Sequence, residues 1–412
     1  MQRDYRRTPW ILVSAAMLML MPAVLMAQDT PGKAAQATHW VGTWATSAQA
    51  IDKSTFPPTP PGLTDTTLRQ IVHVSIGGHQ LRVRFSNEFA SWGNNLTIDE
   101  AHVALSAGKS AIKPETDKAL TFHGQPSATI PFGAMMLSDP IAFDLPALSD
   151  LVVSIHVTGA EKDFTGHRSA RANSYLQSGN SVSASDLPDA VIANRWYYLS
   201  GVEVVASPPT SAVAVLGDSI TDGKGSTEGT NQRWPDVLAR RLQENPGTAG
   251  VSVLNEGIGG NCLWFGGLGQ TAMVRLDRDV IAQPGVRYVI LFEGINDLGG
   301  GQTTPDEIIT ADEQIIARSH GSGLRIYGAT ISPCGGSFYD KPGVEEKRQK
   351  VNEWIRTSGA FDAVIDLDAA VRDPQDPHKL LKSADSGDHL HPSNAGHKLL
   401  GDAVDLKLFA QQ

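Results

Sequence analysis

The stretch SAVAVLGDSITDG at residues 211–223 decides the fold of the second half of the chain. Its first five residues form a continuous apolar run, which is typical of a strand buried on both faces of a sheet. Gly217, Asp218 and Ser219 follow directly, before a helical pattern. Open α/β sheets carry functional groups at the carboxyl ends of their strands, where a helix amino terminus favours negative charge. By itself the stretch fits a reactive serine and an ordinary turn equally well, so later residues must decide.

The length and charge of the chain limit the classes of function. With 412 residues the chain is long for one domain and favours two. Its net charge is −10, and no basic run occurs outside the extreme amino terminus. Binding to nucleic acid or to an anionic membrane needs clustered lysines and arginines, so neither partner is expected.

The amino terminus predicts a signal peptide at residues 1–27. Three arginines among the first seven residues precede an apolar run over residues 10–21, and Ala27 offers a small residue for cleavage. The run is short for a membrane span, so an uncleaved anchor is the less favoured alternative. We therefore expect a secreted or periplasmic protein without stable membrane association after cleavage.

The chain has two cysteines, Cys262 and Cys334, and both follow predicted strands. In an oxidising compartment an even number of cysteines permits a disulfide. A bridge between them and two separate thiols are both open.

Residues 39–206 consist of short β patterns separated by turn residues, with almost no helical periodicity. This pattern predicts a β-rich domain built as an antiparallel sandwich. Residues 68–74 and 80–85 are expected to form a hairpin. The histidines lack metal-ligand spacing, so no metal site is expected. Isolated tryptophans fit either a sugar-stacking surface or core packing; they are Trp40, Trp44, Trp92 and Trp196.

Two prolines mark residues 207–211 as a linker, after which the period of the sequence changes. In residues 212–410, strand-like runs alternate with helical patterns, which predicts a parallel sheet with helices on both faces. Right-handed crossovers would bring the ends of the strands to one edge. The expected strands are 213–216, 251–254, 288–292, 324–329 and 363–365, and the expected helices are 234–242, 271–281, 305–319, 344–358 and 395–409.

Polar residues cluster where these strands end, and together they supply what acyl transfer requires. A serine hydroxyl such as that of Ser219 needs a base to take its proton, and His391 is a candidate. Asp388 lies three residues before it and can hold the imidazole in the correct tautomer. The oxyanion of the intermediate needs fixed donors, and the N–H groups of Ser219 and Gly260 and the Asn296 amide suit that purpose.

These blocks, in this order, resemble the SGNH hydrolases, also called the GDSL esterase/lipase superfamily. The matching blocks are Gly217–Ser219, Gly257–Asn261, Gly294–Asp297 and Asp388–His391. The similarity covers about residues 211–410, and the β-rich first half is similar to that of larger secreted bacterial members. Ile220 stands where the family label has leucine, which is a conservative change.

The resemblance implies a three-layer α/β/α, flavodoxin-like parallel sheet and ester hydrolysis without metal or cofactor. It also implies an oxyanion hole made by the Ser219 and Gly260 N–H groups and the Asn296 amide. The family's Asp-x-x-His-Pro pattern favours His391 over His389 as the base, and Asp388 over Asp385 as its partner. The remaining charged residues near the blocks are expected to hold turns and helices; they are Asp218, Asp297, Arg275 and Asp277.

We therefore expect a secreted serine esterase that hydrolyses carboxylic esters through an acyl-enzyme. Short acyl chains are favoured because no long apolar lid segment is evident. The alternatives are a carbohydrate acetylesterase acting on acetylated polysaccharide, a lipase, and a non-catalytic carbohydrate-binding protein. The expected partner is accordingly a small-molecule or polysaccharide ester.

Overall fold

The computed structural model describes residues 39–159 and 163–410, which form one compact unit. The predicted signal peptide and its cleavage position lie outside the described residues. Among the described residues, no helix is both long and apolar enough to cross a bilayer.

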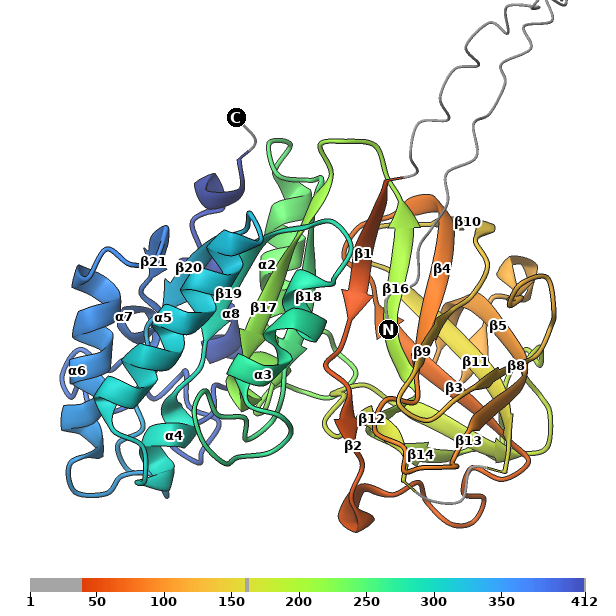
Figure 1. Ribbon diagram of the computed structural model, residues 1–412, viewed down its shortest axis with the longest axis horizontal. Coiled ribbons are helices and arrows are strands. Elements are labelled where there is room, and N and C mark those ends of the chain that lie inside the picture. Colours follow the sequence, from red (N-terminus) through yellow and green to blue (C-terminus); the bar gives the residue numbers. More distant parts are fainter. Residues whose placement is uncertain (1–38, 160–162, 411–412) are drawn as a thin grey trace, which may run out of the picture. The chain divides into compact units, whose positions relative to one another are not determined.

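The β-rich region, residues 39–206, contains three antiparallel sheets (Figure 1). Its elements are β1 (Trp40–Ala45), β2 (Gln49–Ala50), η1 (Lys53–Thr55), β3 (Thr66–His73), β4 (Gly78–Ser86), β5 (Leu96–Gly108), β6 (Ala111–Ile112), η2 (Pro114–Thr116), β7 (Lys118–Ala119), β8 (Ala128–Ile130), β9 (Met135–Leu137), β10 (Ile141–Leu145), β11 (Asp150–Thr158), β12 (Thr165–His167), β13 (Ser174–Ser178), β14 (Val191–Ala193), β15 (Trp196–Tyr197) and β16 (Leu199–Val205). The first sheet has the order β1-β16-β4-β10, with β9 also on β4. The second has the order β14-β13-β3-β11-β5-β6, with β7 and β8 also on β5, and the third has the order β15-β12-β2.

The predicted hairpin is wrong, because β3 and β4 belong to different sheets. β3 pairs with β11 and β13, whereas β4 pairs with β16, β10 and β9. Leu68 of β3 and Leu81 of β4 are both fully buried in one hydrophobic cluster, so the two strands share a core without pairing. The alternating apolar faces that suggested a hairpin are the inner faces of the two sheets.

The tryptophans of this region do not form one sugar-stacking surface. Trp44 and Trp196 are buried and meet edge to face, with ring centroids 4.9 Å apart. Trp92 is 87% exposed and lies beside Phe132 instead, at a centroid distance of 6.2 Å. Core packing therefore accounts for the first two.

The α/β region, residues 211–410, is built on a parallel sheet of order β18-β17-β19-β20-β21. Its strands are β17 (Ser211–Gly217), β18 (Val251–Gly257), β19 (Val286–Phe292), β20 (Arg325–Ala329) and β21 (Ala363–Ile365). Its helices are α1 (Ser219–Asp222), α2 (Trp234–Glu244), α3 (Ala272–Leu276), the π-helical turn η3 (Asp277–Ile281), α4 (Ile295–Gly300), α5 (Pro305–Gly321), α6 (Val344–Thr357), α7 (Leu367–Val371), α8 (Asn394–Ala403) and the 3₁₀ turn η4 (Leu406–Phe409). The five strands and the longer helices lie where the sequence predicts them.

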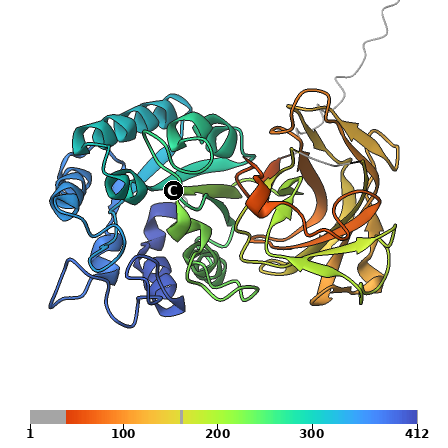
Figure 2. The ribbon, with the colours of Figure 1, turned by 90° about the horizontal axis from the view of Figure 1, so that it is seen from below.

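Both faces of the parallel sheet are covered by helices (Figure 2). Val213 and Val215 of β17 pack in one hydrophobic cluster with residues of α2, α7 and α8. Ala214 and Leu216, which point to the other face, pack with residues of α3, α4, α5 and α6. A strand buried on both faces needs the continuous apolar run that the sequence shows.

The two regions share part of one hydrophobic core. Ala212 of β17 and Leu254 of β18 belong to the cluster that fills the β-rich region. The Gly42 N–H donates to the Pro284 carbonyl at 2.9 Å, and an added Cβ on Gly42 would lie only 3.0 Å from the Leu254 side chain. The predicted linker, 207–211, overlaps β17 by one residue.

The two cysteines are not bridged. Cys262 and Cys334 are both free and buried. Burial raises the pKa of Cys262, and the nearby Asp297 carboxylate raises it further; burial raises the pKa of Cys334 to about 11. Cys334 packs among the helices on one face of the sheet, whereas Cys262 lies against the loop that carries Gly267, so the thiols serve different contacts. The disulfide that the even number of cysteines permitted is therefore absent.

Candidate active site

Ser219 lies just beyond the carboxyl end of β17, as the first residue of α1. Asp218 is the N-cap of this helix, and its carboxylate accepts the Ile220 N–H at 2.8 Å. Gly217 must lack a side chain here, because an added Cβ would lie 2.2 Å from Thr221 Oγ1. This turn leaves the Ser219 hydroxyl at the sheet edge and lining a pocket.

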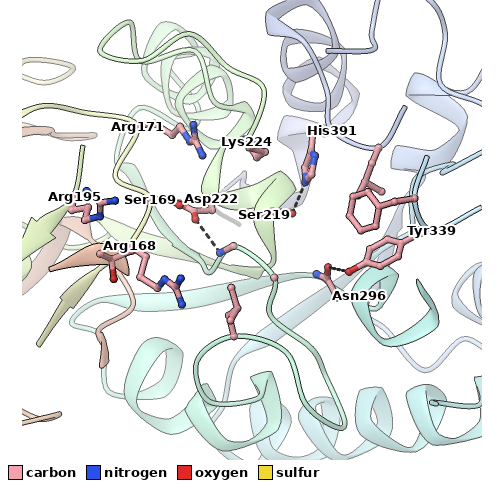
Figure 3. Close-up of a pocket in the computed structure, with 16 residues that line it drawn as sticks. Arg168, Ser169, Arg171, Arg195, Ser219, Asp222, Lys224, Asn296, Tyr339 and His391 are labelled. Atoms are coloured by element: carbon pink, nitrogen blue, oxygen red, sulfur yellow. Dashed lines mark hydrogen bonds between the residues drawn. The ribbon is translucent and has the colours of Figure 1, made fainter. Parts of the chain in front are cut away.

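His391 and Asp388 complete a hydrogen-bonded chain with Ser219, and Figure 3 shows the link between His391 and Ser219. Ser219 Oγ lies 2.9 Å from His391 Nε2, and His391 Nδ1 lies 2.6 Å from Asp388 Oδ2. The Asp388 carboxylate can only accept, so Nδ1 carries the proton and Nε2 is free to accept from the serine hydroxyl. Asp388 also accepts the backbone N–H groups of His391 and Leu390, at 2.8 and 3.1 Å, which fixes the carboxylate in place.

The pKa values of the pair suit a base that is neutral at neutral pH. Burial opposes ionisation of Asp388, but the hydrogen bonds from the His391 backbone and ring, with the attraction of the imidazole, lower the pKa of Asp388 to about 2. Burial also lowers the pKa of His391, and this effect outweighs the opposing influence of Asp388. The carboxylate therefore stays charged while the imidazole stays available as a proton acceptor.

His389 and Asp385 form a separate pair at the rim. Their side chains meet at 2.6 Å, and the His389 side chain is 55% exposed. Asp385 further accepts the Gly387 N–H at 2.8 Å, so it holds the local turn. Of the two candidate histidines, the structure places only His391 against Ser219.

The candidate oxyanion donors come from three different strand ends. Gly260 follows β18 in a left-handed conformation, with φ of +75°, which a side chain would disfavour. Its neighbour Gly259 donates an N–H to Asp222 Oδ2 at 2.9 Å, which ties this loop to α1. In the described part of the chain, no hydrogen bond occupies the N–H of Ser219 or of Gly260.

The orientation of the Asn296 amide follows from its neighbours. Asn296 Nδ2 faces two acceptors, the Asn261 carbonyl at 2.8 Å and Asp218 Oδ2 at 3.4 Å. The amide oxygen must therefore point the other way, where the Tyr339 hydroxyl donates to it at 3.0 Å. Burial raises the pKa of Tyr339, which keeps this hydroxyl protonated. One N–H of Asn296 has only the long contact to Asp218 and can turn to a substrate oxygen.

Ser219, Gly260, Asn296 and His391 line a cavity of about 390 Å³ (Figure 3). The cavity receives side chains from both regions of the chain. The β-rich region supplies Thr55, Arg168, Ser169, Arg171 and Arg195, and the α/β region supplies Ser219, Asp222, Lys224, Gly259, Gly260, Leu268, Asn296, Phe338, Tyr339, Leu390 and His391.

His167 of β12 joins the β-rich region to the turn after Ser219. His167 Nε2 lies 2.9 Å from Asp222 Oδ1, and its Nδ1 lies 3.0 Å from the Ser47 carbonyl. Asp222 also holds Gly259, the residue before the candidate oxyanion donor Gly260. The first half of the chain thus supports the turns that carry Ser219 and Gly260 as well as lining the pocket.

The remaining charged residues near the site hold local structure, as expected from the sequence. Asp297 accepts the N–H groups of Leu263 and Trp264, at 2.9 and 3.0 Å, and Asp277 pairs with Arg318 at 2.8 Å. Among the described residues, no group of three or more histidine, cysteine or acidic side chains is placed to hold a metal ion.

The part of the chain that carries this site matches a known protein family. The sequence profile of the GDSL-like lipase/acylhydrolase family matches residues 215–399. This part of the chain belongs to that family. The match contains Ser219, Gly260, Asn296, Asp388 and His391, and it excludes the β-rich region. A search of curated proteins found no match.

Solved structures of esterases are similar to about half of this chain. A carbohydrate acetylesterase from Sinorhizobium meliloti has 18% identity and a TM-score of 0.38, over 48% of this chain and 98% of its own. An aryl esterase from M. smegmatis has 17% identity and a TM-score of 0.39, over 47% and 95%. An acetylxylan esterase from Geobacillus stearothermophilus has 23% identity and a TM-score of 0.38, over 49% and 95%.

Sequence reasoning missed several residues of the site. Tyr339 and Lys224 stand in loops without a recognisable motif, and three arginines come from the β-rich region, which carries no catalytic pattern. His167 had no functional signal either, because the sequence favours an ordinary sheet or surface role for each histidine of the β-rich region.

The rate of ester hydrolysis should depend on pH through His391. The base must be neutral, and its pKa lies below the ordinary value of 6.5, so kcat/KM should rise with pH and reach its plateau before neutrality. Asp388 remains ionised throughout this range. The check is a profile of kcat/KM for phenyl acetate from about pH 4.5 to about pH 8, with enzyme stability controlled at each pH. A midpoint above 6.5 would contradict the assignment.

Tyr339→Phe should lower kcat about tenfold while changing KM less than about twofold, because Asn296 loses the donor that orients its amide. A loss of folding would instead lower the unfolding temperature and the active fraction. Tyr175→Phe, which removes a hydroxyl in the β-rich region away from the pocket, is the matched control. An unchanged kcat in Tyr339→Phe would show that this hydrogen bond does not matter.

Proposed function

We propose that the protein is a secreted serine esterase that hydrolyses carboxylic esters through an acyl-enzyme intermediate. The observation that carries the proposal is the chain of two hydrogen bonds from Ser219 through His391 to Asp388, in a pocket that also holds Gly260 and Asn296. The family match is at the level of lipases and acylhydrolases, and it supports action on esters. Secretion rests on the sequence of residues 1–27.

Acylation begins when His391 Nε2 takes the proton of Ser219 Oγ. The oxygen then forms a bond to the ester carbonyl carbon, and the resulting oxyanion accepts hydrogen bonds from the N–H groups of Ser219 and Gly260 and from the Asn296 amide. His391, now cationic and stabilised by Asp388, gives its proton to the alcohol oxygen as the bond from carbon to that oxygen breaks. The alcohol leaves and the acyl group stays on Ser219.

Deacylation repeats the same proton transfers with water. His391 takes a proton from the water as the water oxygen bonds to the acyl carbon. The proton returns to Ser219 Oγ when the acyl–serine bond breaks, and the carboxylic acid is released. No cofactor enters either step.

The acyl group is proposed to be short. The pocket is modest in volume and shares its lining between a few apolar side chains, such as Leu268 and Phe338, and many polar ones. A long acyl chain would need an extended apolar channel, whereas an acetyl or propionyl group needs only a small contact.

Ser219→Ala should lower kcat/KM for an aryl acetate by on the order of 10⁴-fold or more, because the nucleophile is lost. A fluorophosphonate probe should label the wild-type protein at Ser219 and leave the variant unlabelled. Ser358→Ala, at an exposed position after α6, is the control and should keep full activity. Near-full activity in Ser219→Ala would end the proposal.

Chain-length preference separates the short-acyl reading from the lipase alternative. Across a series of 4-nitrophenyl esters, kcat/KM should be highest for acetate to butyrate and fall for longer chains. Acetate release from acetylated polysaccharide, measured beside it, tests the carbohydrate acetylesterase alternative. A maximum beyond about eight carbons would reverse the order of the alternatives.

A further inference from the structure

Four cationic side chains line the catalytic pocket of a chain whose net charge is −10. They are Arg168, Arg171 and Arg195 of the β-rich region and Lys224, which follows α1. In Figure 3 the arginines stand on one side of the view and Asn296 and Tyr339 on the other. The catalytic chemistry described above uses none of the four, so their presence needs another reason.

Acidic residues neutralise only part of this charge. Arg168 pairs with Asp52 at 2.7 Å and Arg171 with Glu228 at 3.5 Å, and both carboxylates are about half exposed, at 47% and 49%. Because both carboxylates are about half exposed, solvent weakens these ion pairs. Among the described residues, neither Arg195 nor Lys224 has a carboxylate partner.

Among the described residues, Asp222 is the one acid that lines the pocket, and it does not balance the cations either. Asp222 is buried, and its two oxygens are engaged by His167 at 2.9 Å and by the Gly259 N–H at 2.9 Å. It is therefore committed to holding the loops of the site. The cationic side of the pocket keeps a net positive charge.

Two arginine donors in the pocket are buried without a partner. The Nε atoms of Arg171 and Arg195 are shielded from solvent, and neither has a hydrogen-bond acceptor within the described residues. A buried donor without an acceptor is costly, and it leaves the charge of these two guanidinium groups only partly satisfied by the described residues. Arginine offers two parallel N–H groups that match the oxygens of a carboxylate or phosphate.

The charges also lie near the base that protonates the leaving alcohol. Burial lowers the pKa of His391, and the positive charges of Lys224 and Arg171 lower it further. Charges that act on this imidazole are close to the oxygen to which it gives its proton. Lys224 and Arg171 therefore lie close enough to His391 to act on its charge, and both line the same pocket as Ser219 and His391.

From this geometry we propose that the pocket binds an oxyanionic group, a carboxylate or a phosphate, on the alcohol part of the ester substrate. Arg171, Arg195 and Lys224 hold this group, and Arg168 adds charge at the rim. The inference rests on the proposed esterase function. It limits the proposed substrates to esters whose alcohol part carries a carboxylate or a phosphate, such as an acylated sugar acid or sugar phosphate.

The experiment compares esters that differ only in charge. The probes are 4-acetoxyphenylacetate, its neutral primary amide and 4-acetoxybenzylphosphonate, whose leaving phenols have similar acidity. The wild-type protein should show kcat/KM at least about tenfold higher for the anions than for the amide, mainly through KM. The preference should shrink as salt is added, because salt screens partly exposed charges. The better of the two anions shows whether a carboxylate or a phosphate is preferred.

Variants locate the effect. Lys224→Met and Arg195→Gln should each lower the ratio of kcat/KM on the anion to that on the amide several-fold. Lys113→Met and Arg325→Gln, at exposed positions that do not line the pocket, are the matched controls and should keep the wild-type ratio. Because Lys224 is exposed, its variant tests the charge without disturbing the core.

The outcomes separate this proposal from the proposed function. Equal kcat/KM on the anions and the amide, with both activities lost in Ser219→Ala, would overturn the anionic subsite and leave the esterase intact. The anionic subsite would also be overturned if the ratio of kcat/KM on the anion to that on the amide fell as far in the control variants as in Lys224→Met. The overall charge of the protein would then explain the preference. Hydrolysis of none of the esters, with no fluorophosphonate labelling, would overturn the esterase and the subsite together.

Discussion

The buried guanidinium of Arg275 is the interaction on which the site most depends. Arg275 is fully buried and donates to the Gly217 carbonyl at 2.9 Å and to the Glu256 carbonyl at 2.6 Å, so it joins the ends of β17 and β18. It also donates to Asn261 Oδ1 at 2.9 Å and to Ser47 Oγ of the β-rich region at 2.9 Å. Asn261 in turn accepts the Asn296 amide through its carbonyl. One cation thus fixes the strand that presents Ser219, the loop that carries Gly260 and the orientation of Asn296. Removing one partner from such a buried network typically costs about 3–5 kcal/mol.

The carboxyl groups around this cation are more numerous than it can balance. Glu256, Asp279 and Glu293 are all buried beside Arg275. Burial, followed by the repulsion from Asp279, raises the pKa of Glu256 to about 8, and burial with the charge of Asp218 raises the pKa of Glu293. Burial lifts the pKa of Asp218 to about 7 as well. Some carboxyl groups of this network therefore hold a proton at neutral pH. Their protonation limits the like-charge repulsion beneath Ser219. The pKa of Asp388 is lowered instead of raised. Asp388 lies outside this network and has its own hydrogen-bond donors.

The sequence predicted the elements whose signals are local. The five parallel strands show as apolar runs and the longer helices as periodic patterns, and Ser219, Asp388 and His391 stand in short motifs whose spacing is set by single turns. What failed depends on contacts between distant segments. The strands β3 and β4 show the alternation that is typical of a hairpin. That alternation indicates only that each strand has one buried face. In the structure the two buried faces pack against each other across a sandwich. The role of Tyr339 and of the pocket arginines depends on where loops meet in space, and no periodicity or motif records that. The pairing of the two cysteines was left open for the same reason.

The residues of this site come from two parts of the chain, one inside the family match and one outside it. Every residue assigned to bond making and proton transfer lies within residues 215–399, where strand ends hold it to its neighbours. The pocket arginines lie outside that match, in connections of the β-rich region. Those connections are nevertheless anchored: His167 binds Asp222, and Ser47 shares Arg275 with the strand ends. Ala212 and Leu254 bury their side chains in the core of the β-rich region, so separating the regions would expose apolar surface and leave Asp222 and Arg275 each short of a partner. The β-rich region and the α/β region therefore form the candidate site as one packed unit. Under the proposed function, the loops of the β-rich region bring three arginines to the substrate while the strand ends hold Ser219 and its hydrogen-bonding partners in place.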